Sequence, residues 1–233
     1  MLEIQQLNLE LSGKKILNEL TLKIDSSDQC TAVLGRNGAG KSSLFKSIVG
    51  LERRSVGKVL FNQTRIDTLP PFKRIQQGIA FLAQEIWLFK ELSCIDNLIA
   101  TIEFLGLNKR EYLDQCHSLL KKFDLQNNKS QQASTLSGGE QRRLELARLM
   151  LTQPKLIIMD EPFSGLDPNG CRKLKEIISN LKSLKVRFLI SDHQVHHLKD
   201  ICEKSLLIHS GTVVHHETTD QVLNNQQAID LYL

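Results

Sequence analysis

The octapeptide GRNGAGKS, at positions 35–42, leaves the chain few ways to fold. It fits the pattern GxxxxGK[ST] and stands between an apolar run, CTAVL, and a helix-forming run, SSLFKSIVG. Glycines at these spacings let backbone amides wrap around phosphate oxygens at a helix N-terminus, while Lys41 faces the β and γ phosphates and Ser42 ligates Mg²⁺. The octapeptide therefore predicts a strand–loop–helix unit that binds a triphosphate. The candidate phosphate-binding residues are Gly35, Arg36, Asn37, Gly38, Ala39, Gly40, Lys41, Ser42 and Ser43.

A pair of acidic residues follows a second buried strand, in the segment KLIIMDEP at 155–162. Asp160 ends the apolar run, and open α/β sheets bind ligands at the carboxyl ends of their strands. A buried carboxylate is costly there unless it faces a cation, so Asp160 is predicted to hold Mg²⁺, directly or through water. Glu161 is then placed to orient and polarise a water that attacks a phosphate. The simpler alternative is a pair of acids that caps the loop before Pro162.

Hydrophobic periodicity divides the chain into an α/β core and a helical insertion. The first forty residues alternate with period two, which predicts an antiparallel hairpin leading into a buried strand. The pattern is helical from about residue 93 to 151, and after Pro154 apolar strands alternate with helices, as in a mostly parallel, covered sheet. We predict one α/β domain over 1–233, with a core formed by 1–84 and 152–233 and a helical insertion at 85–151.

Composition narrows the function classes. Lysine and arginine number 30 against 26 acidic residues, and the net charge of +4 is too small and scattered to indicate nucleic-acid binding. The five cysteines show no CxxC spacing, which favours reduced thiols in a cytosolic protein over a metal or redox site. No signal peptide is visible, and the apolar runs are far shorter than the ~20 residues that span a bilayer. We expect a cytoplasmic protein that does not insert into a membrane and that would serve one through a partner.

The segment TLSGGEQRRLEL at 135–146 begins a helix with two glycines. Ser137 and Glu140 fit a capping box, and the apolar residues after them recur at helical spacing, which leaves Arg142, Arg143 and Arg148 to face solvent or a partner. Each glycine costs roughly 1 kcal/mol relative to alanine inside a helix. Something other than stability must therefore require bare backbone in this first turn.

Together with the octapeptide upstream, LSGGE at 136–140 resembles the signature sequence of ATP-binding cassette (ABC) ATPases, and the resemblance covers nearly all 233 residues. It implies a P-loop NTPase core, with an antiparallel β subdomain and an inserted α-helical subdomain, that binds ATP and Mg²⁺ and hydrolyses ATP. In the family two subunits pack head to tail, and the signature of one faces the γ phosphate held by the other. The resemblance therefore implies a homodimer in which Ser137, Gly138 and Gly139 form an anion site at a helix N-terminus.

Single residues gain roles from the same resemblance. Gln84 matches the glutamine that senses Mg²⁺ and the attacking water. Asp167 matches the loop that crosses to the partner subunit's site. His193 matches the switch histidine that contacts the γ phosphate. Without the resemblance, Gln84 would be interpreted as a surface residue and SGLDP as an ordinary turn into a helix. The run HQVHH could suggest a metal site, but it lacks the ligand cluster that zinc requires. Leu11 departs from the family, which usually places an adenine-stacking aromatic there, so weaker nucleotide affinity or base selectivity would follow.

The segment after Gln84, EIWLFKELSCIDNL, exposes Trp87, Leu88 and Phe89 between charged residues. The resemblance implies that they line a groove for a short coupling helix from each of two integral membrane subunits, with an aromatic anchor. The alternative is that they pack inside the helical insertion.

Finer similarities concern the branch of the family. The strings QEIWLFKELSCIDNL, LSGGEQRRLELAR, DEPFSGLDP, SDHQV and IDLYL resemble the ATPases of bacterial lipopolysaccharide exporters, and branched-chain amino acid importer ATPases are near relatives. The resemblance to the lipopolysaccharide exporter ATPases implies a subunit on the cytoplasmic face of the inner membrane that powers lipopolysaccharide export. A soluble ATPase of an assembly complex would have the same nucleotide site, whereas intact Lys41, Asp160, Glu161 and His193 disfavour a regulatory module without hydrolysis.

Overall fold

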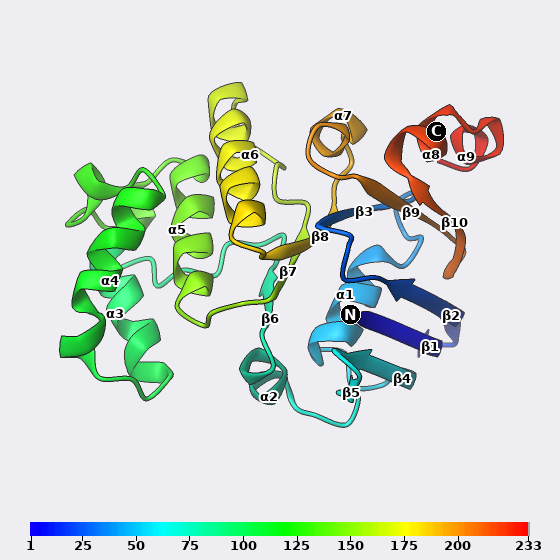
Figure 1. Ribbon diagram of the computed structural model, residues 1–233, viewed down its shortest axis with the longest axis horizontal. Helices are drawn as coiled ribbons and strands as arrows, with labels where there is room; N and C mark the ends of the chain where they lie inside the picture. The colour runs from blue at the N-terminus through cyan, green and yellow to red at the C-terminus, as the bar shows by residue number, and fades with distance from the viewer. Residues whose placement is uncertain (233) are drawn as a thin grey trace.

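The computed structural model describes residues 1–232 and places them in two sheets with helices packed around them (Figure 1). Leu233, the last residue of the IDLYL tail, lies outside the described part. The larger sheet has the strand order β10-β9-β3-β8-β7-β6, in which β10 is antiparallel to β9 and the other neighbours are parallel. Its strands are β3 (Cys30–Leu34), β6 (Ile79–Leu82), β7 (Leu156–Asp160), β8 (Arg187–Ser191), β9 (Lys204–His209) and β10 (Thr212–Thr218).

Both faces of the larger sheet are covered, and this accounts for its unbroken apolar strands. Every residue of β7 is buried; Ile157 and Met159 belong to one apolar core and Ile158 to the other. The same alternation occurs on β3, where Ala32 belongs to the first of these cores and Val33 to the second. Successive side chains of a strand point to opposite faces, so a strand with two covered faces must be apolar at each position. A carboxylate at the end of such a strand, like Asp160, therefore needs a polar partner.

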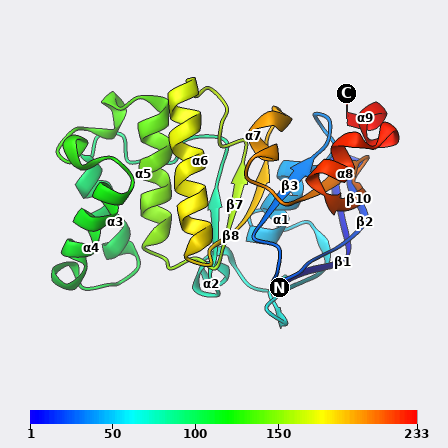
Figure 2. The same ribbon diagram turned by 45° about the horizontal axis from the view of Figure 1, so that its top comes forward.

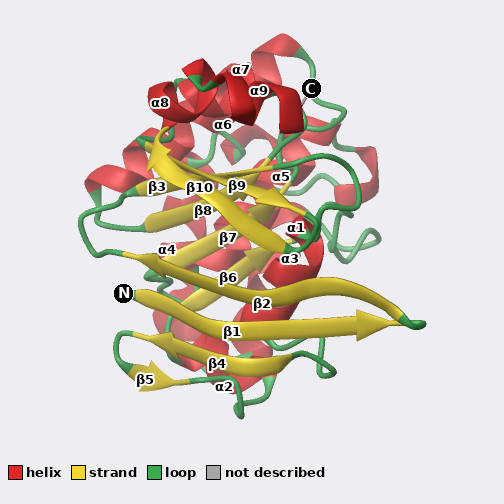
Figure 3. Ribbon diagram, turned by 90° about the vertical axis from the view of Figure 1, so that its right-hand side faces the viewer, coloured by secondary structure: helices red, strands yellow, loops and turns green. Residues whose placement is uncertain are grey.

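The smaller sheet is antiparallel, with the order β2-β1-β4-β5, and Figure 3 shows the two sheets one above the other. Its strands are β1 (Leu2–Leu11), β2 (Lys14–Ile24), β4 (Val56–Phe61) and β5 (Thr64–Arg65). Helix α1 (Lys41–Val49) packs between the sheets, because its buried Leu44, Phe45 and Ile48 share one core with residues of both. The helix that starts at the octapeptide is thus anchored along its apolar face.

Three helices stand at one end of the molecule, and α6 lies between them and the larger sheet (Figures 1 and 2). They are α3 (Cys94–Phe104), α4 (Lys109–Lys122) and α5 (Gly138–Met150), and α6 spans Pro168–Ser183. Buried residues of all four helices and of β7 belong to a single apolar core. The predicted α/β fold class, with an antiparallel sheet and inserted helices, is confirmed.

Shorter helices complete the described chain: α2 (Pro71–Gln76), α7 (Val195–Lys199), α8 (Thr219–Asn224), α9 (Gln226–Tyr232) and the 3-10 turns η1 (Gln126–Asn128) and η2 (Ala133–Thr135). Within residues 1–232, no helix is both long enough and apolar enough to cross a bilayer.

Acid is expected to destabilise the fold through His216 on β10. Partial burial lowers the pKa of its imidazole below the ordinary value, and the opposing charge of Asp28 does not overcome this. The unfolded chain then binds this proton more tightly, so the free energy of unfolding falls as the pH drops below about 6.5. Melting temperatures at pH 7.5 and 5.5 check this: His216→Gln should lose less stability on acidification than the wild type. Equal losses would show that His216 does not contribute.

Candidate active site

The octapeptide forms a tight loop between the end of β3 and the start of α1. Gly38 and Gly40 adopt φ values of +81° and +109°, a region that side chains disfavour. Gly35, with φ +149°, is also required for space, because a Cβ there would lie 2.4 Å from the carbonyl oxygen of Ile208 on β9. The glycines thus let the loop turn sharply and pass close to the neighbouring strand.

Lys41, the first residue of α1, points its ammonium back into this loop. Its Nζ donates to the carbonyl oxygens of Gly35, at 2.6 Å, and Arg36, at 3.2 Å. Burial lowers the pKa of the ammonium below its ordinary value, while the charges of Glu161 and Asp160 oppose that shift. The cation is therefore held inside the loop and close enough to both acids to feel their field.

The two acids stand at the end of β7, beside the end of β8. The carboxylate of Asp160 is buried and accepts a hydrogen bond from Ser191 Oγ at 2.6 Å. Glu161 adopts φ +50° and donates its backbone N–H to the carbonyl oxygen of Ser191 at 2.9 Å. A left-handed glutamate is strained, and such strain persists where the surroundings fix it, often at functional sites.

The predicted catalytic residues meet at the carboxylate of Glu161. Gln84 follows β6 and donates its Nε2–H to Glu161 Oε2 at 2.8 Å. His193 follows β8 and places Nε2 2.6 Å from Glu161 Oε1. The strands β6, β7 and β8 are neighbours in the sheet, so the structure brings these three side chains to one point from segments far apart in sequence.

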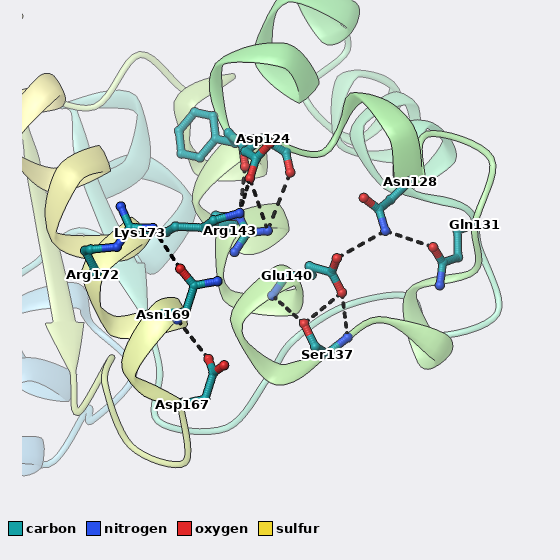
Figure 4. Close-up of polar contacts among 12 residues, drawn as sticks. Asp124, Asn128, Gln131, Ser137, Glu140, Arg143, Asp167, Asn169, Arg172 and Lys173 are labelled. Carbon is teal, nitrogen blue, oxygen red and sulfur yellow. Dashed lines mark hydrogen bonds and ion pairs between the residues drawn. The ribbon is translucent and has the colours of Figure 1, made fainter.

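The predicted capping box at the start of α5 is confirmed (Figure 4). Ser137 Oγ accepts from the backbone N–H of Glu140 at 3.4 Å, and Glu140 Oε2 accepts from the backbone N–H of Ser137 at 2.8 Å. Asn128 donates to the other oxygen of Glu140 at 3.2 Å. The first turn of α5 is therefore fixed while Gly138 and Gly139 leave its backbone bare.

Asp167 begins α6 next to this turn. Its Oδ1 accepts from the backbone N–H of Gly170 at 2.8 Å, which makes it the N-cap of α6. A Cβ on Gly139 would lie 3.4 Å from the Cα of Gly170, an ordinary van der Waals distance, so the starts of α5 and α6 are direct neighbours. Sequence reasoning missed this contact between the two helix starts.

Arginines of α5 correct one expectation. Arg142 and Arg143 were predicted to face solvent or a partner, but both side chains are buried. Arg142 donates to the backbone carbonyls of Ala83 and Gln84 and pairs with Glu145 at 2.9 Å. Glu145 Oε1 in turn accepts from the backbone N–H of Trp87 at 2.6 Å. Helix α5 is thus hydrogen-bonded to the segment that carries Gln84.

A family model described as "ABC transporter" matches residues 17–164, well over half of the chain. The chain belongs to the ABC transporter family. The lipopolysaccharide export system ATP-binding protein LptB of Haemophilus influenzae is 33% identical, covering all of this chain and 97% of its own length. LptB of Escherichia coli K12 is also 33% identical, over 95% of this chain and 92% of its own. A probable ABC transporter ATP-binding protein of Azorhizobium caulinodans is 30% identical, with 95% and 78% covered.

Solved structures agree with the fold of this ABC protein. An ATP-binding cassette of an ABC transporter in its ADP conformation superposes with a TM-score of 0.91 at 23% identity, covering all of this chain and 98% of the other. The ATP-binding subunit of another ABC transporter gives 0.81 at 28% identity, covering 100% and 94%. The chain is accordingly an ATP-binding and ATP-hydrolysing subunit of an ABC transporter.

In this ABC ATPase the segment after Gln84 forms an aromatic surface, defined by Trp87, Leu88 and Phe89. Trp87 and Phe89 are about half exposed, at 51% and 52%, whereas Leu88 packs against the core. The Arg148 guanidinium lies 5.3 Å from the centre of the Phe89 ring, and the Trp87 ring meets Phe81 edge to face at 6.0 Å. Beside Trp87 lies an apolar hollow of about 200 Å³, lined by residues that include Leu51, Ile75 and Leu149. Leu88 is thus packed inward, whereas the rings of Trp87 and Phe89 are half exposed.

Proposed function

We propose that the chain powers lipopolysaccharide export as the ATPase subunit of an inner-membrane ABC exporter. The observation that supports this most is the 33% identity to the LptB proteins of Haemophilus influenzae and Escherichia coli, which covers 100% and 95% of this chain, respectively. Two copies of the chain would form a homodimer on the cytoplasmic face of the membrane, bind two MgATP, close, and drive two integral membrane subunits. ATP moves this equilibrium only because it binds the closed state more tightly.

The site residues divide the chemistry among them. The amides of 35–43 and the Lys41 ammonium would bind the phosphates. Mg²⁺ prefers oxygen ligands, and the buried Asp160 carboxylate with the Ser42 hydroxyl and the Gln84 amide oxygen fits that preference. When bound, Mg²⁺ neutralises charge on the β and γ phosphates. Glu161 would orient and polarise the attacking water, and His193, held 2.6 Å from it, would contact the γ phosphate.

The position of α5 supports the proposed dimer. In Figures 1 and 2, α6, β7 and β8 stand between α5 and α1, so the LSGGE turn and the phosphate loop of one chain lie on different sides of the core. The bare amides of Gly138 and Gly139 and the Ser137 hydroxyl suit an anion, since the helix dipole favours negative charge there. We infer that the phosphate loop of a second copy faces this anion site. Asp167 would then lie near the interface between the two copies.

The aromatic surface is the proposed contact with the membrane subunits. Exposed aromatic side chains beside an apolar hollow are what a partner's short helix needs as an anchor. In this function the chain neither binds nucleic acid nor inserts into the lipid bilayer.

The test is a mild-detergent pull-down from native membranes with mass spectrometry of the bound proteins. Wild-type chain should recover two inner-membrane proteins of the lipopolysaccharide export type, and Trp87→Ala/Phe89→Ala should lose them. Phe104→Ala is the matched control, because Phe104 is exposed on α3 outside the aromatic surface and should keep both partners. Recovery of importer subunits, or of soluble partners alone, would refute the export assignment and leave the ATPase chemistry standing.

A further inference from the structure

We propose that Asp192 is a positioning residue for ATP hydrolysis, which clamps the segment of Glu161 to the segment of His193. Asp192 lies between Ser191, the last residue of β8, and His193. Its side chain is 4% exposed. It does not carry a predicted role in binding ATP or Mg²⁺.

The two carboxylate oxygens of Asp192 hold two different segments. Oδ2 accepts from the backbone N–H of Phe163 at 3.3 Å, two residues after Glu161. Oδ1 accepts from the backbone N–H of Gln194 at 2.9 Å, one residue after His193. A buried carboxylate needs such donors, and a group that uses both oxygens on two chain segments fixes their separation.

Packing around Phe163 adds to this clamp. The imidazole of His197, on α7, lies with Nδ1 3.5 Å from Asp192 Oδ1 and its ring centre 4.9 Å from that of Phe163. Phe163 is therefore held through its amide by Asp192 and through its ring by His197. The side chain of Phe163 is buried at 2% exposure, so the loop after Glu161 has little room to shift.

The neighbouring residue strengthens the same connection. Ser191 accepts the backbone N–H of Glu161 on its carbonyl and donates its hydroxyl to Asp160. The pair Ser191–Asp192 thus contacts the chain at 160, 161 and 163. The result is the 2.6 Å contact between His193 and Glu161, which depends on two loops keeping their relative position.

Loss of this clamp should slow the chemical step and leave ATP binding unchanged. A misplacement of about 1 Å at reacting groups costs up to ~100-fold in rate. The two backbone groups that Asp192 holds belong to Phe163 and Gln194, whereas Lys41 is held by the carbonyls of Gly35 and Arg36, so we expect the ground-state affinity for ATP to be retained. The expected effect is therefore a decrease of kcat with little change in KM, as when an interaction acts in the transition state.

Asp192→Asn is the principal test because it keeps the size and removes one acceptor. Its amide group can accept at one oxygen only, and its NH₂ would face a backbone N–H. In the full chain we expect kcat for ATP to fall about tenfold or more, with KM and the affinity for a fluorescent ATP analogue within about twofold of wild type. Asp192→Ser, which is smaller and cannot clash, should fall in the same way.

Thr219→Val is the matched control. Thr219 is buried and exchanges hydrogen bonds with Ser205 Oγ at 3.0 Å and the Cys202 carbonyl at 2.7 Å, away from the clamp. It should lose some stability and keep wild-type kcat. Wild-type kcat in Asp192→Asn, or a rise in KM alone, would overturn the proposal. Failure of both Asp192 variants to melt cooperatively would also overturn it, because Asp192 would then be needed for folding and not for alignment.

Discussion

Glu161→Gln is expected to reduce ATP turnover about 100-fold or more while ATP binding is retained, because a general base contributes 10²- to 10⁴-fold. The substitution keeps the size of the side chain but removes the charge that polarises water. Gln84 and His193 both meet this carboxylate, at 2.8 and 2.6 Å, so the variant changes the centre of the cluster. With ATP and Mg²⁺ present, ATP-bound dimers should accumulate. Phosphate release and size-exclusion chromatography measure the two effects.

Glu103→Gln serves as the control for charge removal, because Glu103 is exposed on α3 and is not one of the candidate site residues. It should hydrolyse ATP at the wild-type rate. Wild-type hydrolysis by Glu161→Gln would remove Glu161 from its proposed role, whereas loss of ATP binding would make it a binding residue.

Much of the candidate site could be predicted because its parts are local. The phosphate loop and the capping box are each encoded within a few residues, and their geometry follows from glycine φ angles and an N-cap. The strand-end position of Glu161 could be predicted from the sequence pattern. The roles of Gln84 and His193 came only from the family resemblance, since neither residue carries a local signal. The adjacency of β6, β7 and β8 itself depends on packing between distant segments.

What escaped prediction depends on contacts that sequence spacing does not encode. Arg142 looks like a surface residue on an amphipathic helix, yet its acceptors are the carbonyls of Ala83 and Gln84, more than fifty residues away in the chain. Gly139 meets Gly170 only because α5 and α6 pack side by side. Nothing in the sequence around an arginine or a glycine indicates which distant residues it will contact. Helix periodicity alone predicts that Arg142 faces solvent.

Glu145→Ala is expected to lower the free energy of unfolding by about 3–5 kcal/mol, the cost of leaving one partner of a buried ion pair without the other. Glu145 and Arg142 have side chains 6% and 4% exposed, 2.9 Å apart. Burial already raises the pKa of the Glu145 carboxyl above its ordinary value even though Arg142 opposes this, so the pair stands in a poorly solvated place. Trp87 would also lose the acceptor of its backbone N–H. Urea unfolding with the slope compared between variants measures the loss.

Glu176→Ala is the matched control, since Glu176 pairs with Arg172 on α6 at 2.5 Å but both side chains are more than half exposed. An exposed pair of this kind contributes about 0–1 kcal/mol, so the two variants should differ severalfold. Equal small losses would mean that the Arg142–Glu145 pair does not stabilise the fold. A large loss would have a functional consequence, because the same pair joins α5 to the segment from Gln84 to Trp87. At a temperature where Glu145→Ala remains folded, it should then weaken recovery of the membrane subunits even though the Trp87 and Phe89 side chains are intact.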